Sequence, residues 1–213
     1  VQAPERGRLR LDLAPELAAH VEDSGRCLTK LPVLQEALLD RGPVDGSGVA
    51  TLAAAEPVRQ AAADQIRDIA RSICAESGLR GRLLDKDCLH VTLHGVGEFE
   101  GLPRSEIARA IEAAGSVSMA AFDIGFDRAM SFTSRQNRPL VLRAGDGHTE
   151  LRGLHRLLGD AMRRGGLWKN VRNSFTPHIT LLYDARLLAE KPVPTVRWTV
   201  REFVLVHSPQ GHS

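Results

Sequence analysis

The chain has 213 residues with 28 lysines and arginines against 26 aspartates and glutamates, so its net charge is +2 at neutral pH. This slight positive charge is compatible with a phosphate ligand but lacks the dense basic stripe that is typical of duplex-binding proteins. No apolar run approaches the roughly 20 residues that a helix needs to cross a bilayer, and the length predicts one sizeable domain with a small appendage.

Three cysteines, Cys27, Cys74 and Cys88, make an odd number, and no two of them form a CxxC motif. This pattern argues against a disulfide framework and against a structural zinc site. Because thiols stay reduced inside the cell, we expect a cytoplasmic protein. The first residues, VQAPERGRLRLDLAP, do not contain the apolar stretch of a signal peptide.

The first 45 residues differ in pattern from the rest, and we predict that 1–45 form a helical N-terminal extension. Apolar residues at helical spacing favour short helices over 15–21 and 30–40. The segment RGPVDGSG (41–48) is rich in glycine, proline and aspartate, as linkers often are. The main domain is therefore expected over 46–213.

From residue 49 onwards, strand patterns and helix patterns alternate. Short apolar runs between glycines and prolines predict strands, and apolar stripes with a period of 3.6 residues predict helices. The expected strands are 49–53, 88–96, 118–127, 139–144, 175–183 and 196–208. The expected helices are 58–77, capped by Gly78, 105–115 and 149–166. This order predicts an α+β fold.

One unit occurs twice in this order of elements. The helix over 58–77 leads to the strand sequence LHVTL (89–93), and the helix over 149–166 leads to PHITL (177–181). Two copies are too few for a solenoid. They instead predict a domain of two lobes related by an internal pseudo-twofold axis.

Each copy carries a histidine and a threonine separated by one residue. Side chains on a strand alternate between its two faces, so His90 and Thr92 share one face and Val91 points to the other. His178 and Thr180 repeat this arrangement. If the pseudo-twofold axis relates the two strands, the two imidazoles face each other across a cleft, with one hydroxyl beside each.

Paired histidines and threonines suit the chemistry of a phosphodiester. Displacement at phosphorus needs a base on the attacking oxygen and an acid on the leaving oxygen, and imidazole serves as either near neutral pH without a metal. Threonine hydroxyls can donate hydrogen bonds to the non-bridging oxygens as charge builds up. A single His-x-Thr is usually a structural or surface feature, but two copies at equivalent positions favour catalysis by His90 and His178.

These motifs and their surroundings resemble the 2H phosphoesterase superfamily, in particular the bacterial 2′-5′ RNA ligases, also called RNA 2′,3′-cyclic phosphodiesterases. The resemblance extends over about residues 46–208. It rests on LHVTLHGVGEFEGLP (89–103), SFTSRQNRPLVLRAGDG (131–147), FTPHITLLYD (175–184) and VRWTVREFVLVHS (196–208). It implies two pseudo-symmetric βα-rich lobes with antiparallel sheets that face a central cleft, lined by both motifs.

The same resemblance implies hydrolysis of 2′,3′-cyclic phosphates on RNA ends or nucleotides to 2′-phosphates, with no metal or other cofactor and no membrane partner. Members of the family also join or cleave 2′-5′ linked RNA in vitro. By analogy, His178 activates the water and His90 protonates the leaving 3′-oxygen. Thr92 and Thr180 hold the phosphate.

The chain departs from the family pattern at Tyr183. Many bacterial members have an arginine five residues after the second histidine, where it contacts phosphate. Arg135 and Arg138, in the loop before the 139–144 strand, are candidates to replace it, and a solvated loop arginine is an equally ordinary interpretation of each. Tyr183 and Phe132 are candidates to stack on a base, although Phe132 could equally belong to the core.

Several alternatives remain open from the sequence. The enzyme could act on another cyclic or 2′-5′ linked nucleotide, or the fold could bind RNA or nucleotides without turnover. Residues 1–45 could also make the chain an interaction protein with an attached enzymatic domain. On a strand, His90 and His94 lie about 13 Å apart, too far to share a zinc ion. His94 shares the face of His90, however, and could contact substrate at the edge of the cleft.

Overall fold

The computed structural model describes residues 8–11, 49–58, 60–100, 103–133, 138–145 and 148–209. Its strands are β1 (Arg8–Leu11), β2 (Val49–Pro57), β3 (His90–Glu100), β4 (Met119–Ala120), β5 (Phe122–Ser131), β6 (Pro139–Arg143), β7 (His178–Tyr183), β8 (Lys191–Val200) and β9 (Glu202–Pro209). Its helices are α2 (Gln60–Ser77), α3 (Arg104–Gly115) and α4 (Thr149–Arg164), with 3-10 turns at Lys86–Cys88 and Trp168–Asn170.

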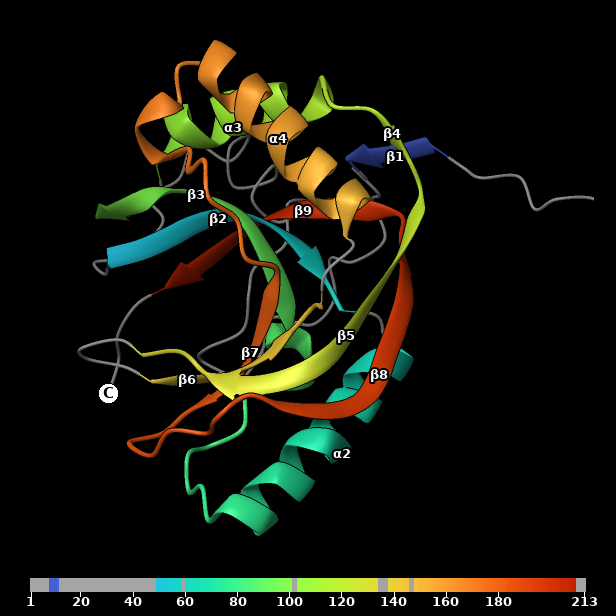
Figure 1. The fold of residues 1–213 in the computed structure, drawn as a ribbon. Helices are drawn as coiled ribbons and strands as arrows, with labels where there is room; N and C mark the ends of the chain where they lie inside the picture. Colours follow the sequence, from blue (N-terminus) through green and yellow to red (C-terminus); the bar gives the residue numbers. More distant parts are fainter. Residues whose placement is uncertain are drawn as a thin grey trace, which may run out of the picture.

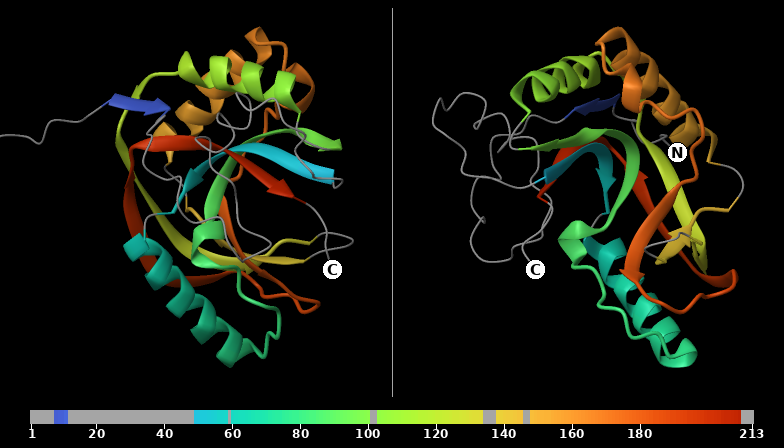
Figure 2. Two further views of the ribbon diagram at one scale, coloured as in Figure 1. Left: turned by 180° about the vertical axis from the view of Figure 1, so that it is seen from behind. Right: turned by 90° about the vertical axis from the view of Figure 1, so that its left-hand side faces the viewer.

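The strands form one curved sheet in the order β4-β1-β9-β2-β3-β7-β6-β5-β8. Neighbouring strands run antiparallel, apart from the parallel pair of β1 and β9. The helices α3 and α4 lie side by side over the lobe that contains β1 and β3, whereas α2 lies at the opposite end against β8 (Figures 1 and 2). The predicted α+β fold of two lobes with antiparallel strands is confirmed.

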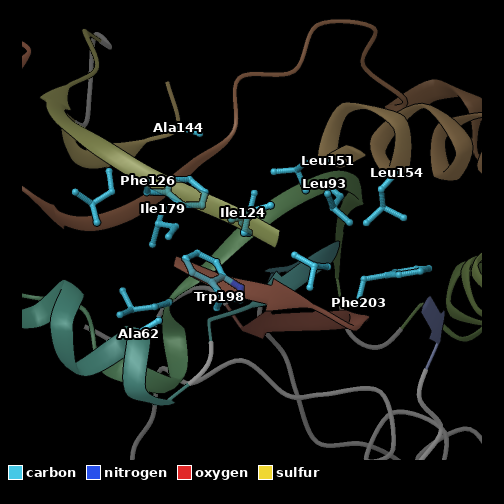
Figure 3. Packing of buried hydrophobic residues seen from close by; sticks show 14 of the residues in the cluster. Ala62, Leu93, Ile124, Phe126, Ala144, Leu151, Leu154, Ile179, Trp198 and Phe203 are labelled. Atoms are coloured by element: carbon cyan, nitrogen blue, oxygen red, sulfur yellow. The ribbon is translucent and has the colours of Figure 1, made fainter. Parts of the chain in front are cut away.

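The two lobes meet where β3 pairs with β7. The pair is in register at Val91 and Ile179, and both of these side chains are fully buried. They belong to the apolar core that also includes Phe126, Trp198 and Leu151 (Figure 3). Because one face of β3 and β7 is buried in the core, the side chains on the other face of these two strands are held in fixed positions.

The last strand differs from the prediction. The sequence suggested one long strand over 196–208, but the structure has β8 and β9 separated at Arg201, which is exposed. The break exists because β8 pairs with β5 in one lobe and β9 pairs with β2 in the other. The chain thus crosses between lobes at a point that apolar alternation alone does not mark.

Of the predicted extension over 1–45, the structure describes only Arg8–Leu11. These residues form β1, a strand that the sequence analysis did not anticipate and that lies between β4 and β9 (Figure 1). The helices predicted over 15–21 and 30–40 fall outside the described residues. The domain boundary near residue 45 stays a prediction.

Candidate active site

The two His-x-Thr motifs lie next to each other at the junction of the lobes. Because Val91 pairs with Ile179 in an antiparallel ladder, His90 lies opposite Thr180 and Thr92 lies opposite His178. All four side chains are partly buried, in contrast to the fully buried residues between them. The structure thus brings the four motif residues together on one face of adjacent strands.

Each imidazole is oriented by a main-chain carbonyl two residues earlier in the chain. Nδ1 of His90 donates to the oxygen of Cys88 at 2.8 Å, and Nδ1 of His178 donates to the oxygen of Thr176 at 2.7 Å. A carbonyl oxygen can only accept, so Nδ1 carries the proton in both rings. This leaves Nε2 of each ring for contact with a substrate.

The two histidines differ in their surroundings. Burial lowers the pKa of His90 below its ordinary value, the bond to Cys88 opposes this shift, and the nearby His178 adds to it. His90 is therefore neutral at pH 7 in the empty site, with its Nε2 3.1 Å from the hydroxyl oxygen of Thr92. His178 instead meets the ring of Phe132 edge-on, with ring centroids 5.0 Å apart.

A cavity of about 820 Å³ opens beside His178. Both aromatic residues that the sequence suggested for base stacking, Phe132 and Tyr183, line it. Tyr183 is 50% exposed, so its ring has a face available to a ligand. Thr176, whose carbonyl orients His178, also lines the cavity, so the cavity adjoins His178 although none of the four motif residues is in its lining.

Arg143 is a residue of this site that the sequence analysis missed. It is the direct partner of His178 in the β6–β7 ladder and lines the same cavity. Its Nη1 binds Oε2 of Glu190 at 3.2 Å, and the other oxygen of Glu190 lies 3.7 Å from Nη1 of Arg128. A cation at the end of the apolar run PLVLR was the available signal, but only the strand register shows that it lies opposite His178.

The two arginines suggested as replacements for the family's phosphate contact have different outcomes. Arg138 is exposed, and its Nη1 donates to the carbonyl oxygen of Ala185 at 2.6 Å. It is not among the residues that line the cavity. Arg135 lies outside the described residues.

His94 does not lie at the edge of the cleft. The register between β2 and β3 shifts between Ala54 and Ala55, next to Leu93, and this bulge interrupts the alternation of side chains before His94. The His94 ring is 2% exposed and stacks on His155 of α4, with centroids 3.9 Å apart. The prediction that His94 shares the face of His90, and could therefore contact substrate at the edge of the cleft, is wrong.

Within the described ranges, no three His, Cys, Asp or Glu side chains gather in a way that could hold a metal ion. In the same ranges, no helix has both the length and the apolar character needed to cross a membrane. The groups available for chemistry at the lobe junction are imidazoles, hydroxyls and a guanidinium.

Comparisons with known proteins agree with this architecture. The family model described as the 2′-5′ RNA ligase superfamily matches residues 54–212, which include both His-x-Thr motifs. No curated protein gives a significant match.

Several solved structures share the fold. A structure described as a phosphoesterase has a TM-score of 0.55 and 26% identity, and the match covers 73% of this chain and 86% of that one. E. coli LigT in its apo form has a TM-score of 0.55 and 25% identity, with 78% and 96% covered. E. coli LigT complexed with 3′-AMP has a TM-score of 0.59 and 25% identity, with 78% and 91% covered.

Proposed function

Because the chain belongs to the 2′-5′ RNA ligase superfamily, we propose that it hydrolyses 2′,3′-cyclic phosphates on RNA ends or nucleotides to 2′-phosphates. The observation that carries this proposal is the pairing of β3 with β7, in which each histidine of one motif is opposite the threonine of the other. Family and fold support a phosphoesterase or ligase type of enzyme. Our proposal goes further in two respects: it specifies a 2′,3′-cyclic phosphate as the substrate and the cytoplasm as the location.

In this mechanism the two histidines act on opposite sides of the phosphorus. His178 takes a proton from water, whose oxygen attacks phosphorus, and the bond from phosphorus to the 3′-oxygen breaks. His90 gives its proton to the 3′-oxygen, so the products are a 2′-phosphate and a free 3′-hydroxyl. An acid and a base positioned in this way each contribute roughly 10²–10⁴-fold to the rate.

The acid role of His90 requires that it be protonated when substrate is bound. Burial holds its pKa low in the empty site. A phosphate anion in contact with the ring favours the imidazolium and so raises the pKa again. Substrate binding thereby supplies the charge that makes His90 an acid at neutral pH.

The remaining side chains hold the substrate. Thr92 and Thr180, which flank the two imidazoles, donate hydrogen bonds to the non-bridging oxygens, where charge builds up during attack. Arg143 adds a cation next to His178, in place of the arginine that the family pattern has at position 183. Phe132 and Tyr183 take the base in the adjoining cavity, and the 3′-AMP that is bound in one LigT structure supports a nucleotide as ligand.

The test is hydrolysis of 2′,3′-cyclic AMP, followed by chromatography in the presence of EDTA. We expect wild-type activity that survives the chelator, and losses in kcat/KM of about 10²–10⁴-fold for His90→Ala and for His178→Ala. His148→Ala is the matched control, because His148 packs on Phe126 rather than on either motif. Full activity in either motif variant would rule out the two-histidine mechanism.

If wild-type protein is inactive on this substrate, a 2′-5′ linked dinucleotide and other cyclic nucleotides are the next substrates, since the same acid–base pair serves them. Binding without turnover of every member of this panel would instead indicate a nucleotide-binding module.

A further inference from the structure

A second pocket, of about 360 Å³, lies between α4 and the segment 171–175, outside the cleft of the histidine pair. Its charged and titratable lining consists of Arg152, Arg156, Arg163, Arg172, His94 and His155. No aspartate or glutamate of the described chain lines it. The pocket therefore concentrates positive charge on a protein whose net charge is only +2.

Within the part of the chain that the structure describes, two of the four arginines have a protein partner and two do not. Arg163 is held by Asp160 at 2.8 Å and by Asn173 at 2.6 Å, and Arg152 donates to the carbonyl oxygen of Phe175 at 3.0 Å. For Arg156 and Arg172, the described residues provide no hydrogen bond or ion pair. Four arginines with one carboxylate partner, Asp160, repel one another, and a bound anion would relieve this repulsion.

A second, independent observation comes from His94, which is 2% exposed and lines the pocket. Its Nε2 donates to the carbonyl oxygen of His155 at 2.7 Å, while its Nδ1 has no hydrogen-bond partner among the described residues. A buried ring nitrogen without a partner is uncommon, because its desolvation is not compensated. A ligand in the pocket would supply the missing partner.

Close packing keeps this ring in place. A Cβ atom on Gly159 would lie 3.0 Å from Nε2 of His94 and 3.1 Å from Cγ1 of Val171, so a larger residue there would push these side chains outward. The His155 ring is stacked between His94 and Phe175, at centroid distances of 3.9 and 4.3 Å. The pocket thus combines a wall of packed rings with four exposed arginines at its rim.

The field in the pocket favours anions. Burial, together with the electrostatic effect of His94, Arg163 and Arg152, lowers the pKa of His155 to about 4. The potential that opposes a proton on His155 is the same potential that attracts a negative group.

We propose that this pocket is a second anion site, distinct from the histidine pair, that binds a phosphate group. The group is either a phosphodiester of an RNA strand or the phosphate of a free nucleotide. Arg156 and Arg172 contact its oxygens. The bound anion favours the imidazolium form of His94, whose Nδ1 then donates to a phosphate oxygen. The segment that carries Arg172 continues to Thr176, whose carbonyl orients His178, so an occupied pocket lies one short segment away from the active site.

The test is an NMR titration of the full chain with sodium phosphate at pH 7, read at backbone amides. We expect saturable shifts at Arg156, Val171 and Arg172, separate from any shifts at Thr92 and Thr180. The double variant Arg156→Gln/Arg172→Gln should weaken binding at the pocket amides at least about tenfold, since it removes two charge-assisted contacts. Binding at the motif amides should be unchanged.

Matched controls separate this effect from a change in net charge. Arg164→Gln/Arg201→Gln removes two exposed arginines outside the pocket and should leave binding intact. Arg156→Lys/Arg172→Lys keeps the charge and should retain part of the affinity. Pocket amides that fail to shift in wild-type protein, or that shift with equal affinity in the glutamine variant, would overturn the proposal.

Titrations with two further ligands distinguish the two sources of the phosphate. One ligand is 2′-AMP, and the other is a short RNA that ends in a 2′-phosphate. If the pocket holds a strand phosphate, the glutamine variant weakens the RNA but not 2′-AMP. If it holds a free nucleotide, 2′-AMP itself shifts the pocket amides. Because these experiments measure binding, they are informative whether or not the proposed hydrolysis is found.

Discussion

The two histidines have the same support but different surroundings. Both donate Nδ1–H to the carbonyl two residues earlier, as expected for equivalent positions in a repeated unit. His90 lies with its Nε2 3.1 Å from the hydroxyl oxygen of Thr92, and burial lowers its pKa, whereas His178 packs against the ring of Phe132. This asymmetry is how one motif, used twice, can supply both a base and an acid.

The first prediction concerns the pKa of His90, which NMR can follow through its ring protons. In the free protein the ring should titrate below the ordinary value near 6.5, because burial disfavours the charged form. Addition of 2′-AMP should raise the pKa, since the phosphate favours the imidazolium. An unchanged or lower pKa in the complex would contradict the role of His90 as the acid.

The second prediction concerns the two hydroxyls. Thr92→Val and Thr180→Val preserve the shape of the side chain but remove a donor to the phosphate. Each should lower kcat by about 10–10³-fold with a smaller change in KM, because such a contact strengthens as charge builds up. A rise in KM alone would show instead that the threonines bind the ground state and the transition state equally.

At the scale of elements, the sequence predicted the faces of a strand correctly where the apolar alternation and the His-x-Thr motif agreed. The faces of β3 and β7 follow from the apolar residues Val91 and Ile179 inside each motif, so the shared face of His90 and Thr92 could be predicted. Register could not, because it depends on pairing between distant strands. Arg143 was missed for this reason.

Local irregularities account for the other differences. The bulge beside Leu93 turns His94 under α4, and strict alternation cannot foresee a residue that breaks it. The break at Arg201 likewise reflects a change of pairing partner, which the continuous apolar pattern of 196–208 conceals.

The third prediction concerns the cavity at the ends of β6 and β7. Tyr183→Ala should raise KM for nucleotide substrates, because a base stacked on an aromatic ring contributes about 1–3 kcal/mol. Leu187→Ala is the matched control, since Leu187 is equally exposed at 50% but does not line the cavity. Equal KM values in the two variants would show that the nucleobase of the substrate does not stack on Tyr183.

At the scale of the whole molecule, the two lobes meet at one pair of strands, and the reactive groups lie at that junction. The strand β1 lies well away from it, between β4 and β9 in the same sheet. A change at β1 should therefore alter the stability of the protein without altering the catalytic activity at the β3–β7 junction.

The fourth prediction uses this separation. Removing residues 1–11 deletes β1 and leaves edges of β4 and β9 unpaired. Backbone hydrogen bonds contribute about 0.5–1.5 kcal/mol each, so the free energy of unfolding should fall by roughly 1–4 kcal/mol. Urea unfolding measures this, and kcat/KM below the urea transition should be unchanged. A loss of activity without a loss of stability would assign β1 a role at the site.

The central claim, that the paired histidines open a 2′,3′-cyclic phosphate at the 3′-oxygen, is tested most directly by the identity of the product. Phosphorus NMR of a short RNA that ends in a 2′,3′-cyclic phosphate, incubated with wild-type protein and EDTA, distinguishes a 2′-phosphate from a 3′-phosphate. We predict the 2′-phosphate alone, and no product with His90→Ala or His178→Ala. A 3′-phosphate, or a cyclic phosphate that persists with wild-type protein, would contradict the account.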